Sequence, residues 1–154
     1  ILASFDVQVI KDMDADELYY KFRKAFNVTS NDTKQNSWRK WSHSVIESAK
    51  FMANFKDADD FRGFVAQFDY NRPARMALPL LISTKISGIG FALACDTLKK
   101  LGYLSYPKPF VHLIEVFSQL GLSEEDQKSV FEAIVEMAEV CKKSGSGIIA
   151  IQAG

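Results

Sequence analysis

The segment Ile86-Ser87-Gly88-Ile89-Gly90, near the middle of the chain, constrains the fold more than any other feature. An apolar stretch with three- and four-residue spacing precedes the two glycines, and a second one follows them. Glycine accepts the positive φ values that a tight reversal needs, and it leaves neighbouring backbone N–H groups uncovered. The pattern therefore predicts two helices joined by a short glycine turn, over about residues 74–102.

Apolar residues recur at helical spacing along almost the whole chain, and the alternation typical of strands is scarce. The breaks between helical segments fall at Asn, Pro, Gly or Ser residues. The chain has 154 residues, of which 47% are hydrophobic, and this is enough to bury one sizeable core. We therefore expect an all-α helical bundle that forms a single domain over residues 1–154.

Local signals predict where the helices begin and end. Asp14 or Asp16 is expected to cap the first long helix, and Gly102 is expected to end the helix that follows the turn. Pro73 is typical of a helix start, whereas Pro79 in the same segment predicts a kink or a break. The expected helices are 37–55, 57–70, 73–86, 90–101, 111–120 and 124–142, the last capped within Ser123-Glu124-Glu125-Asp126, with a short apolar docking segment at 148–151.

Charge is balanced overall but unevenly distributed. The 19 basic and 19 acidic side chains cancel, which argues against a protein that coats nucleic acid nonspecifically. Residues 71–110 carry six basic side chains and one acid, and residues 111–140 carry seven acids and one lysine. We expect a basic face and an acidic C-terminal helix that is a candidate surface for a protein partner; ordinary solvated helix faces are the alternative.

The sequence predicts no metal site, no cofactor and no membrane segment. Cys95 and Cys141 lack the spacing of a zinc or iron–sulfur site, and His43 and His112 lie in unrelated segments. No run of eighteen apolar residues is present, and the first residues lack the basic start of a secretory signal. A soluble, intracellular, cytoplasmic protein with reduced cysteines is expected.

A second motif, Phe110-Val111-His112, follows the glycine turn by about twenty residues and opens the next expected helix. Together with Leu113, Val116 and Gly121-Leu122, the two motifs resemble the helix-hairpin-helix superfamily of base-excision DNA glycosylases over about residues 78–122. The resemblance implies an all-helical, DNA-glycosylase-like fold that grips double-stranded DNA through the hairpin and draws one base into a pocket.

The glycine turn is the candidate phosphate site. It directs backbone N–H groups toward the N-terminus of the second helix, where the helix dipole also favours an anion. A nucleic-acid phosphate is the expected occupant. The candidate phosphate-binding residues are Thr84, Lys85, Gly88, Gly90, Lys99 and Lys100.

The sequence departs from the family where its chemistry is expected. Phe110 replaces the aspartate before the Val-His step, and Ala92 replaces the lysine with which bifunctional members form a Schiff base. If the chain is catalytic, it is therefore expected to be a monofunctional DNA N-glycosylase-like hydrolase. The remaining catalytic candidates are Asp96, Lys108 and His112. The alternatives are that Asp96 is a solvated helix carboxylate, that Lys108 is a surface cation and that His112 is a structural histidine.

Aromatic residues are candidates for stacking a flipped base. Tyr103 and Phe110, in or beside the loop after the hairpin, are the base-pocket candidates, whereas Trp38 and Trp41 lie on a helical stripe and are expected in the core. The sequence favours a DNA-binding domain that recognises a lesion or a DNA structure. The alternative is a catalytically inactive helical domain for protein interaction or assembly.

Overall fold

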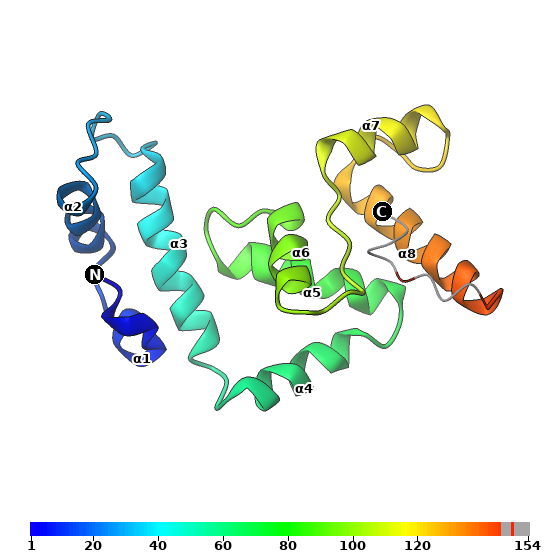
Figure 1. Cartoon of the computed structure of the whole chain (residues 1–154), viewed down its shortest axis with the longest axis horizontal. Coiled ribbons are helices and arrows are strands. Elements are labelled where there is room, and N and C mark those ends of the chain that lie inside the picture. Colours follow the sequence, from blue (N-terminus) through cyan, green and yellow to red (C-terminus); the bar gives the residue numbers. More distant parts are fainter. Residues whose placement is uncertain (146–148, 150–154) are drawn as a thin grey trace. The chain divides into compact units, whose positions relative to one another are not determined.

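The computed structural model describes residues 1–145 and 149, and every regular element in this part of the chain is a helix. Figure 1 shows these elements in order: η1 (Ala3–Phe5), α1 (Val7–Ile10), α2 (Ala15–Ala25), α3 (Ser37–Met52), α4 (Ala58–Phe68), α5 (Arg72–Lys85), α6 (Phe91–Lys100), α7 (Val111–Gln119) and α8 (Gln127–Lys143). The all-α prediction is confirmed for the described residues. The docking segment expected at 148–151 lies outside them, apart from Ile149.

The chain forms two compact units. Unit 1 consists of Ile1–Phe61 and Ser83–Ile89, and unit 2 consists of Arg62–Ile82 and Gly90–Gly154. The division between the units falls within α4, within α5 and at the end of the glycine turn. That the whole chain behaves as a single domain stays a prediction.

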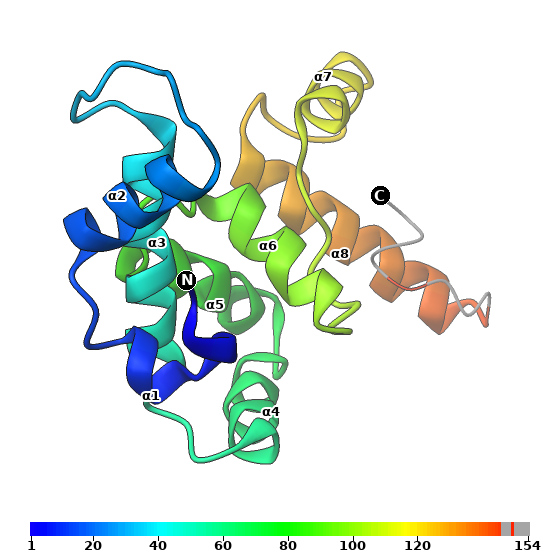
Figure 2. The ribbon, with the colours of Figure 1, turned by 60° about the vertical axis from the view of Figure 1, so that its left-hand side comes forward.

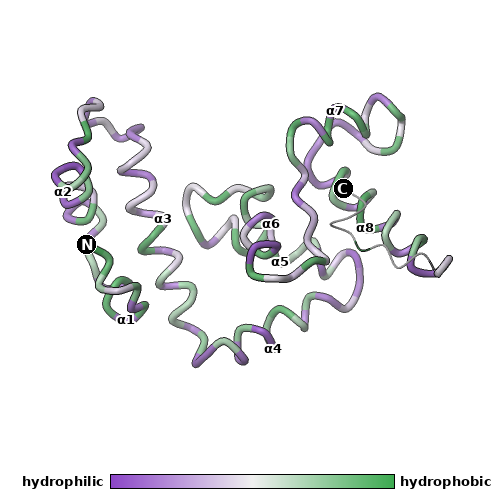
Figure 3. Tube along the Cα trace, viewed as in Figure 1, coloured by the Kyte–Doolittle hydropathy of each residue, from purple (hydrophilic) through white to green (hydrophobic). Residues whose placement is uncertain are grey.

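In unit 1, α2 packs along α3, and α1 also contacts α3 (Figures 1 and 2). Its core contains Ile10, Leu18, Phe22, Ile46 and Ala49. The core positions within α2 and within α3 lie three or four residues apart, so each helix buries one stripe of its surface. Figure 3 shows the corresponding interleaving of hydrophobic and hydrophilic residues along the helices.

The helix starts in unit 1 follow from side-chain caps. Asp14 accepts a hydrogen bond from the N–H of Glu17 at 2.9 Å, so Asp14 and not Asp16 caps α2. Asn36 accepts one from the N–H of Trp38 at 2.9 Å and caps α3. Each of these bonds satisfies an N–H that has no partner inside its helix.

In unit 2, α7 contacts α8, and the buried side chains come from all of its longer helices. They include Val65, Leu78, Ile82, Ala94, Leu98, Phe117, Val130 and Ile134. The rings of Phe91 and Phe131 meet edge to face with their centroids 5.5 Å apart. Helix α5 continues past Pro79 to Lys85, so the expected break does not occur, and the proline ring is fully buried.

Two helix ends in unit 2 bear directly on the predictions. Gly102 has φ +94, and the N–H of Tyr103 donates to the carbonyl of Leu98 at 3.0 Å, so Gly102 ends α6 as expected. The expected start of α8 at residue 124 is wrong, because Asp126 is the cap. Its carboxylate accepts the N–H groups of Lys128 and Ser129, and the helix therefore begins at Gln127.

Candidate functional site

The glycine turn is a tight reversal in which Gly88 is required by the structure. Gly88 has φ +81, a value that L-residues adopt only under strain. A Cβ at this position would lie 2.6 Å from Oγ of Ser44. The N–H of Ile89 donates to the carbonyl of buried Ile86 at 3.2 Å and closes the turn.

Helix α3 holds the turn through the residue before Gly88. The hydroxyl of Ser44 donates to the carbonyl of Ser87, and the carboxylate of Glu47 accepts the N–H of the same residue. Ser44 and Glu47 are three residues apart and therefore share a face of α3. Both backbone groups of Ser87 are thus hydrogen-bonded to α3 within unit 1.

Gly90 differs from Gly88 because nothing in the fold requires a glycine there. Its φ of −78 and ψ of 172 suit any residue, and no atom lies within 4 Å of the position that a Cβ would take. Gly90 is the N-cap of α6, and no side-chain hydrogen bond caps this helix. Helix α6 therefore begins at an exposed residue, and no other atom covers the side-chain position of that residue.

The six candidate phosphate-binding residues fall into two groups. Thr84 and Lys85 form the exposed end of α5 and immediately precede the turn. Lys99 and Lys100 lie in the last turn of α6, about 14 Å along the helix axis from Gly90 at 1.5 Å per residue. The structure therefore keeps Thr84 and Lys85 beside the turn and places the other two lysines at the opposite end of α6.

Asp96, one of the catalytic candidates, lies in an ion-paired cluster of unit 2. Its Oδ2 is 2.9 Å from Nζ of Lys100 and 3.5 Å from Nζ of Lys108, and its side chain is only 12% exposed. The hydrogen bond from Lys100, together with the charge of Lys108, holds the pKa of Asp96 below its ordinary value despite the opposing effect of burial.

This cluster is suited to joining α6 to the segment before α7. A carboxylate with a lowered pKa is a weak general base. An ammonium engaged with a carboxylate does not offer the electron pair that a Schiff-base nucleophile needs. In this arrangement Asp96 is poorly suited to act as a general base, and Lys108 is poorly suited to act as a nucleophile.

Phe110 and His112, which open α7, are both exposed. Phe110 is 42% exposed, and its ring lies edge-on to the ring of His112 with the centroids 6.0 Å apart. Tyr103 is half-buried in the loop after α6. These three aromatic rings offer apolar surface in unit 2, and of the two base-pocket candidates Phe110 is the more exposed.

Unit 1 carries an exposed aromatic cluster at a place where the sequence predicts core positions. Phe26 stacks on Trp38 with ring centroids 5.4 Å apart, and Trp38 meets Trp41 edge to face at 5.6 Å. Phe26 is 57% exposed and Trp41 is 48% exposed, so the expectation of a core position is wrong for Trp41. Ser37, Trp38 and Trp41 line a hollow of about 280 Å³. The helical stripe identified the helix face correctly but could not show that α2 covers only part of it.

The basic surplus of residues 71–110 is partly neutralised within unit 2. Arg72 pairs with Glu136 at 3.0 Å and with Glu139 at 3.3 Å. Arg75 lies 2.6 Å from Asp69 and 3.6 Å from Glu139. Two acids of α8 are thus engaged inside the unit, which reduces the charge available to an external partner.

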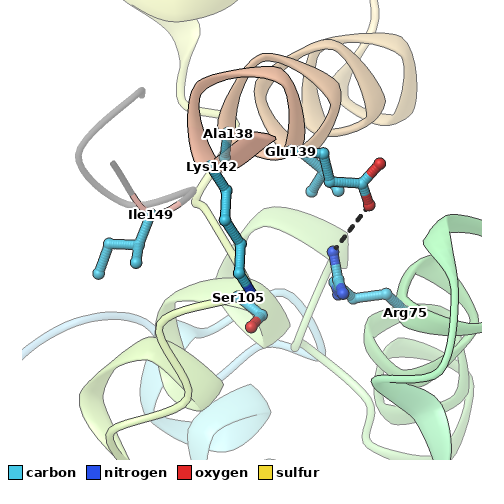
Figure 4. Close-up of a pocket in the computed structure, with 7 residues that line it drawn as sticks. Arg75, Ser105, Ala138, Glu139, Lys142 and Ile149 are labelled. Carbon is cyan, nitrogen blue, oxygen red and sulfur yellow. Dashed lines mark ion pairs between the residues drawn. The ribbon is translucent and has the colours of Figure 1, made fainter. Parts of the chain in front are cut away.

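A hollow of about 150 Å³ adjoins this ion-pair network (Figure 4). Arg75, Ser105, Glu139 and Lys142 contribute polar groups to it, and Ile149 lies at its edge. Figure 4 shows the Arg75–Glu139 ion pair and the side chain of Lys142 extending toward Ser105. The arginine of this hollow is already paired with two carboxylates, those of Asp69 and Glu139.

Two further features concern metals and membranes. Within residues 1–145 and 149, no three His, Cys, Asp or Glu side chains are grouped so that they could hold a metal ion. Among the same residues, none of the helices has the length and apolar character needed to cross a bilayer.

Comparisons with protein-family models, with curated proteins and with solved structures find no match to this chain.

Proposed function

We propose that this chain is a DNA-binding domain that contacts a phosphate of double-stranded DNA through its glycine turn. The observation that carries the proposal is Gly90, where the fold accepts any residue and yet the chain has a glycine. A glycine that the fold does not need suits a position where backbone must approach a ligand closely. The uncapped N-terminus of α6 supplies N–H donors and a favourable dipole at the same point.

The residues beside the turn support the same proposal. Thr84 and Lys85 are exposed at the end of α5, directly before the turn. In residues 1–145 and 149, Lys85 and Lys99 take part in no ion pair, whereas Lys100 and Lys108 are engaged with Asp96. Lys85 is therefore the lysine best placed to add charge to a phosphate contact at the turn.

The proposed role is recognition of a lesion or a DNA structure, with no lyase chemistry. Ala92 provides no amine, and Phe110 provides no carboxylate at the position of the family's aspartate. The resemblance to base-excision glycosylases supports a bent or base-flipped duplex as the preferred ligand. If base removal occurs, it is expected to be hydrolytic and monofunctional.

The test compares Gly90→Asp with Gly90→Asn. Both residues are good N-caps at the φ and ψ of Gly90, so both variants should fold as stably as the parent. The two side chains have nearly the same shape, and only aspartate repels a phosphate. We expect Gly90→Asp to weaken salt-sensitive binding at least tenfold and Gly90→Asn to weaken it clearly less, measured by fluorescence anisotropy with an undamaged duplex and with one that bears an abasic-site analogue.

Gln67→Glu is the charge-matched control, because Gln67 is exposed on α4 and the change also adds one negative charge. It should alter affinity less than twofold. Equal affinities for Gly90→Asp and Gly90→Asn, in folded proteins, would contradict the phosphate contact. No salt-sensitive binding to either duplex would remove the DNA proposal altogether.

A second candidate function, assembly through a protein interface, is favoured by the aromatic cluster of unit 1. Its half-exposed rings and apolar hollow would gain from burial against a second copy of the chain. Sedimentation equilibrium should then show self-association that survives 0.5 M salt and weakens in Trp41→Ala but not in Tyr70→Ala, which removes an exposed ring of unit 2. A monomer at all concentrations would exclude this function.

A further inference from the structure

We propose that Glu47 sets the affinity of the glycine turn for an anion, because its carboxylate occupies the Ser87 N–H and its charge opposes a phosphate at the neighbouring amides. The inference rests on the proposed phosphate contact and extends it to a residue outside the turn. Nothing in the sequence around Glu47 predicts this role, since the residue is forty positions away from Ser87.

The geometry places the carboxylate directly at the turn. The N–H of Ser87, the residue next to Gly88, donates to Oε2 of Glu47. The hydroxyl of Ser44, one turn earlier on α3, is uncharged and donates to the Ser87 carbonyl. Of the two α3 side chains that hold Ser87, only Glu47 therefore brings a negative charge.

The charge of Glu47 is offset by this backbone donor. Within the described residues Glu47 has no ion-pair partner, and the Ser87 N–H donates a hydrogen bond to its carboxylate. A carboxylate and a phosphate use the same kind of donor and repel each other when they lie a few ångströms apart. A phosphate that binds at the turn therefore does so against the negative charge of Glu47.

Glu47→Gln separates the hydrogen bond from the charge. The amide oxygen of glutamine still accepts the Ser87 N–H, but the side chain is neutral. We expect Glu47→Gln to bind an undamaged duplex at least threefold more tightly than the parent at low salt. The gain should shrink as salt screens the repulsion.

Two control variants distinguish the charge of Glu47 from net charge and from loosening of the turn. Glu132→Gln removes one negative charge from an exposed position on α8 and should change affinity less than twofold. Ser44→Ala removes the other side chain that holds Ser87 without changing charge, and it should not raise affinity. If Ser44→Ala tightens binding as much as Glu47→Gln does, release of the turn and not charge is responsible, and the inference is overturned.

A second readout keeps the inference distinct from the proposed function. Inorganic phosphate is titrated into the ¹⁵N-labelled parent and Glu47→Gln, and the amide resonances of residues 87–91 are followed. Saturation at a lower phosphate concentration in Glu47→Gln supports the inference even if neither protein binds duplex. If Gly90→Asp abolishes duplex binding but Glu47→Gln leaves it unchanged, the proposed function is kept and the role of Glu47 is rejected. Phosphate titrations that do not differ between the parent and Glu47→Gln would also reject the role of Glu47.

Discussion

Gly88 and Gly90 are two residues apart, but the structure constrains them in different ways. Replacing Gly88 with alanine places a Cβ at φ +81 and 2.6 Å from Oγ of Ser44. The unfavourable backbone alone costs about 1–2 kcal/mol, and the contact with Ser44 adds to it. We expect Gly88→Ala to lower the free energy of unfolding by at least that amount, measured by urea denaturation followed by circular dichroism.

Gly90→Asn is the matched comparison, and its free energy of unfolding should stay within about 0.5 kcal/mol of the parent's. In the double variant Gly88→Ala/Ser44→Ala, part of the loss should be recovered, because the short contact is removed and only the backbone strain remains. A Gly88→Ala protein as stable as the parent would show that the turn has a different conformation in solution.

These two glycines also show how much the sequence predicts about a single residue. The spacing of Gly88 and Gly90 predicted the turn, but nothing in the sequence distinguished the glycine that the backbone requires from the one it does not. The distinction depends on φ and on the nearness of Ser44, which lies more than forty residues earlier. Contacts of this kind are created by folding and have no local signature.

The ionisation of Asp96 makes the stability of the folded protein depend on pH in the acid range. Because the pKa of Asp96 is lower in the folded protein than its ordinary value of 3.8, its ionised form contributes stability that is fully present above that value. The contribution is lost as the pH falls below about 4 and through the lowered pKa. Urea midpoints measured between pH 7 and pH 2.5 should therefore fall less steeply for Asp96→Asn than for the parent.

The exposed carboxylate of Asp12 provides the control for this measurement. Asp12→Asn is expected to keep the slope of the parent, since among the described residues no lysine pairs with Asp12 as Lys100 and Lys108 pair with Asp96. If Asp96→Asn and the parent lose stability in parallel, the ion pairs with Lys100 and Lys108 do not persist in solution.

At the scale of an element, α8 depends on a cap that the sequence only approximately located. The stretch Ser123-Glu124-Glu125-Asp126 contains several residues that could begin a helix, and the structure uses Asp126. Two N–H groups and the hydroxyl of Ser129 converge on its carboxylate, and these hydrogen bonds lower the pKa of Asp126. The hydroxyl of Ser129, three residues later, adds a side-chain hydrogen bond to the two backbone bonds of this cap.

Removal of this cap should weaken α8. We expect Asp126→Ala to lower the free energy of unfolding by about 1 kcal/mol, a typical cost for loss of an N-cap. Hydrogen exchange should accelerate at the first turn of α8 and not at its C-terminal half. Glu125→Ala, one position earlier, should have an effect below about 0.5 kcal/mol; equal effects of the two substitutions would contradict the assignment of the cap.

At the scale of the whole molecule, two natural probes report on the two units. Both tryptophans of the chain, Trp38 and Trp41, are in unit 1, and buried Cys95 is in unit 2. Burial raises the pKa of the Cys95 thiol to about 12, so its thiolate is scarce in the folded protein and its reaction with Ellman's reagent requires unfolding.

We expect tryptophan fluorescence and Cys95 reactivity to change at the same urea concentration. Helices α4 and α5 each continue from one unit into the other, so the unfolding of either unit would disrupt helices that both share. Cys141 is replaced by serine so that the reaction reports on Cys95 alone. Transitions with separate midpoints would contradict the prediction of a single domain over residues 1–154.

The sequence by itself determined that the described chain is helical, where most helices begin and end, and that a glycine turn separates α5 from α6. These features depend on local physics: the apolar spacing along one helix face, a carboxylate or amide that caps the first turn, and a glycine that adopts positive φ. Only the tertiary structure decided that Glu47 and Ser44 hold Ser87, that Asp96 is paired with two lysines and that Trp41 is half exposed. Each depends on segments that meet only after the chain has folded, and the energy of such contacts is absent from any local stretch of sequence.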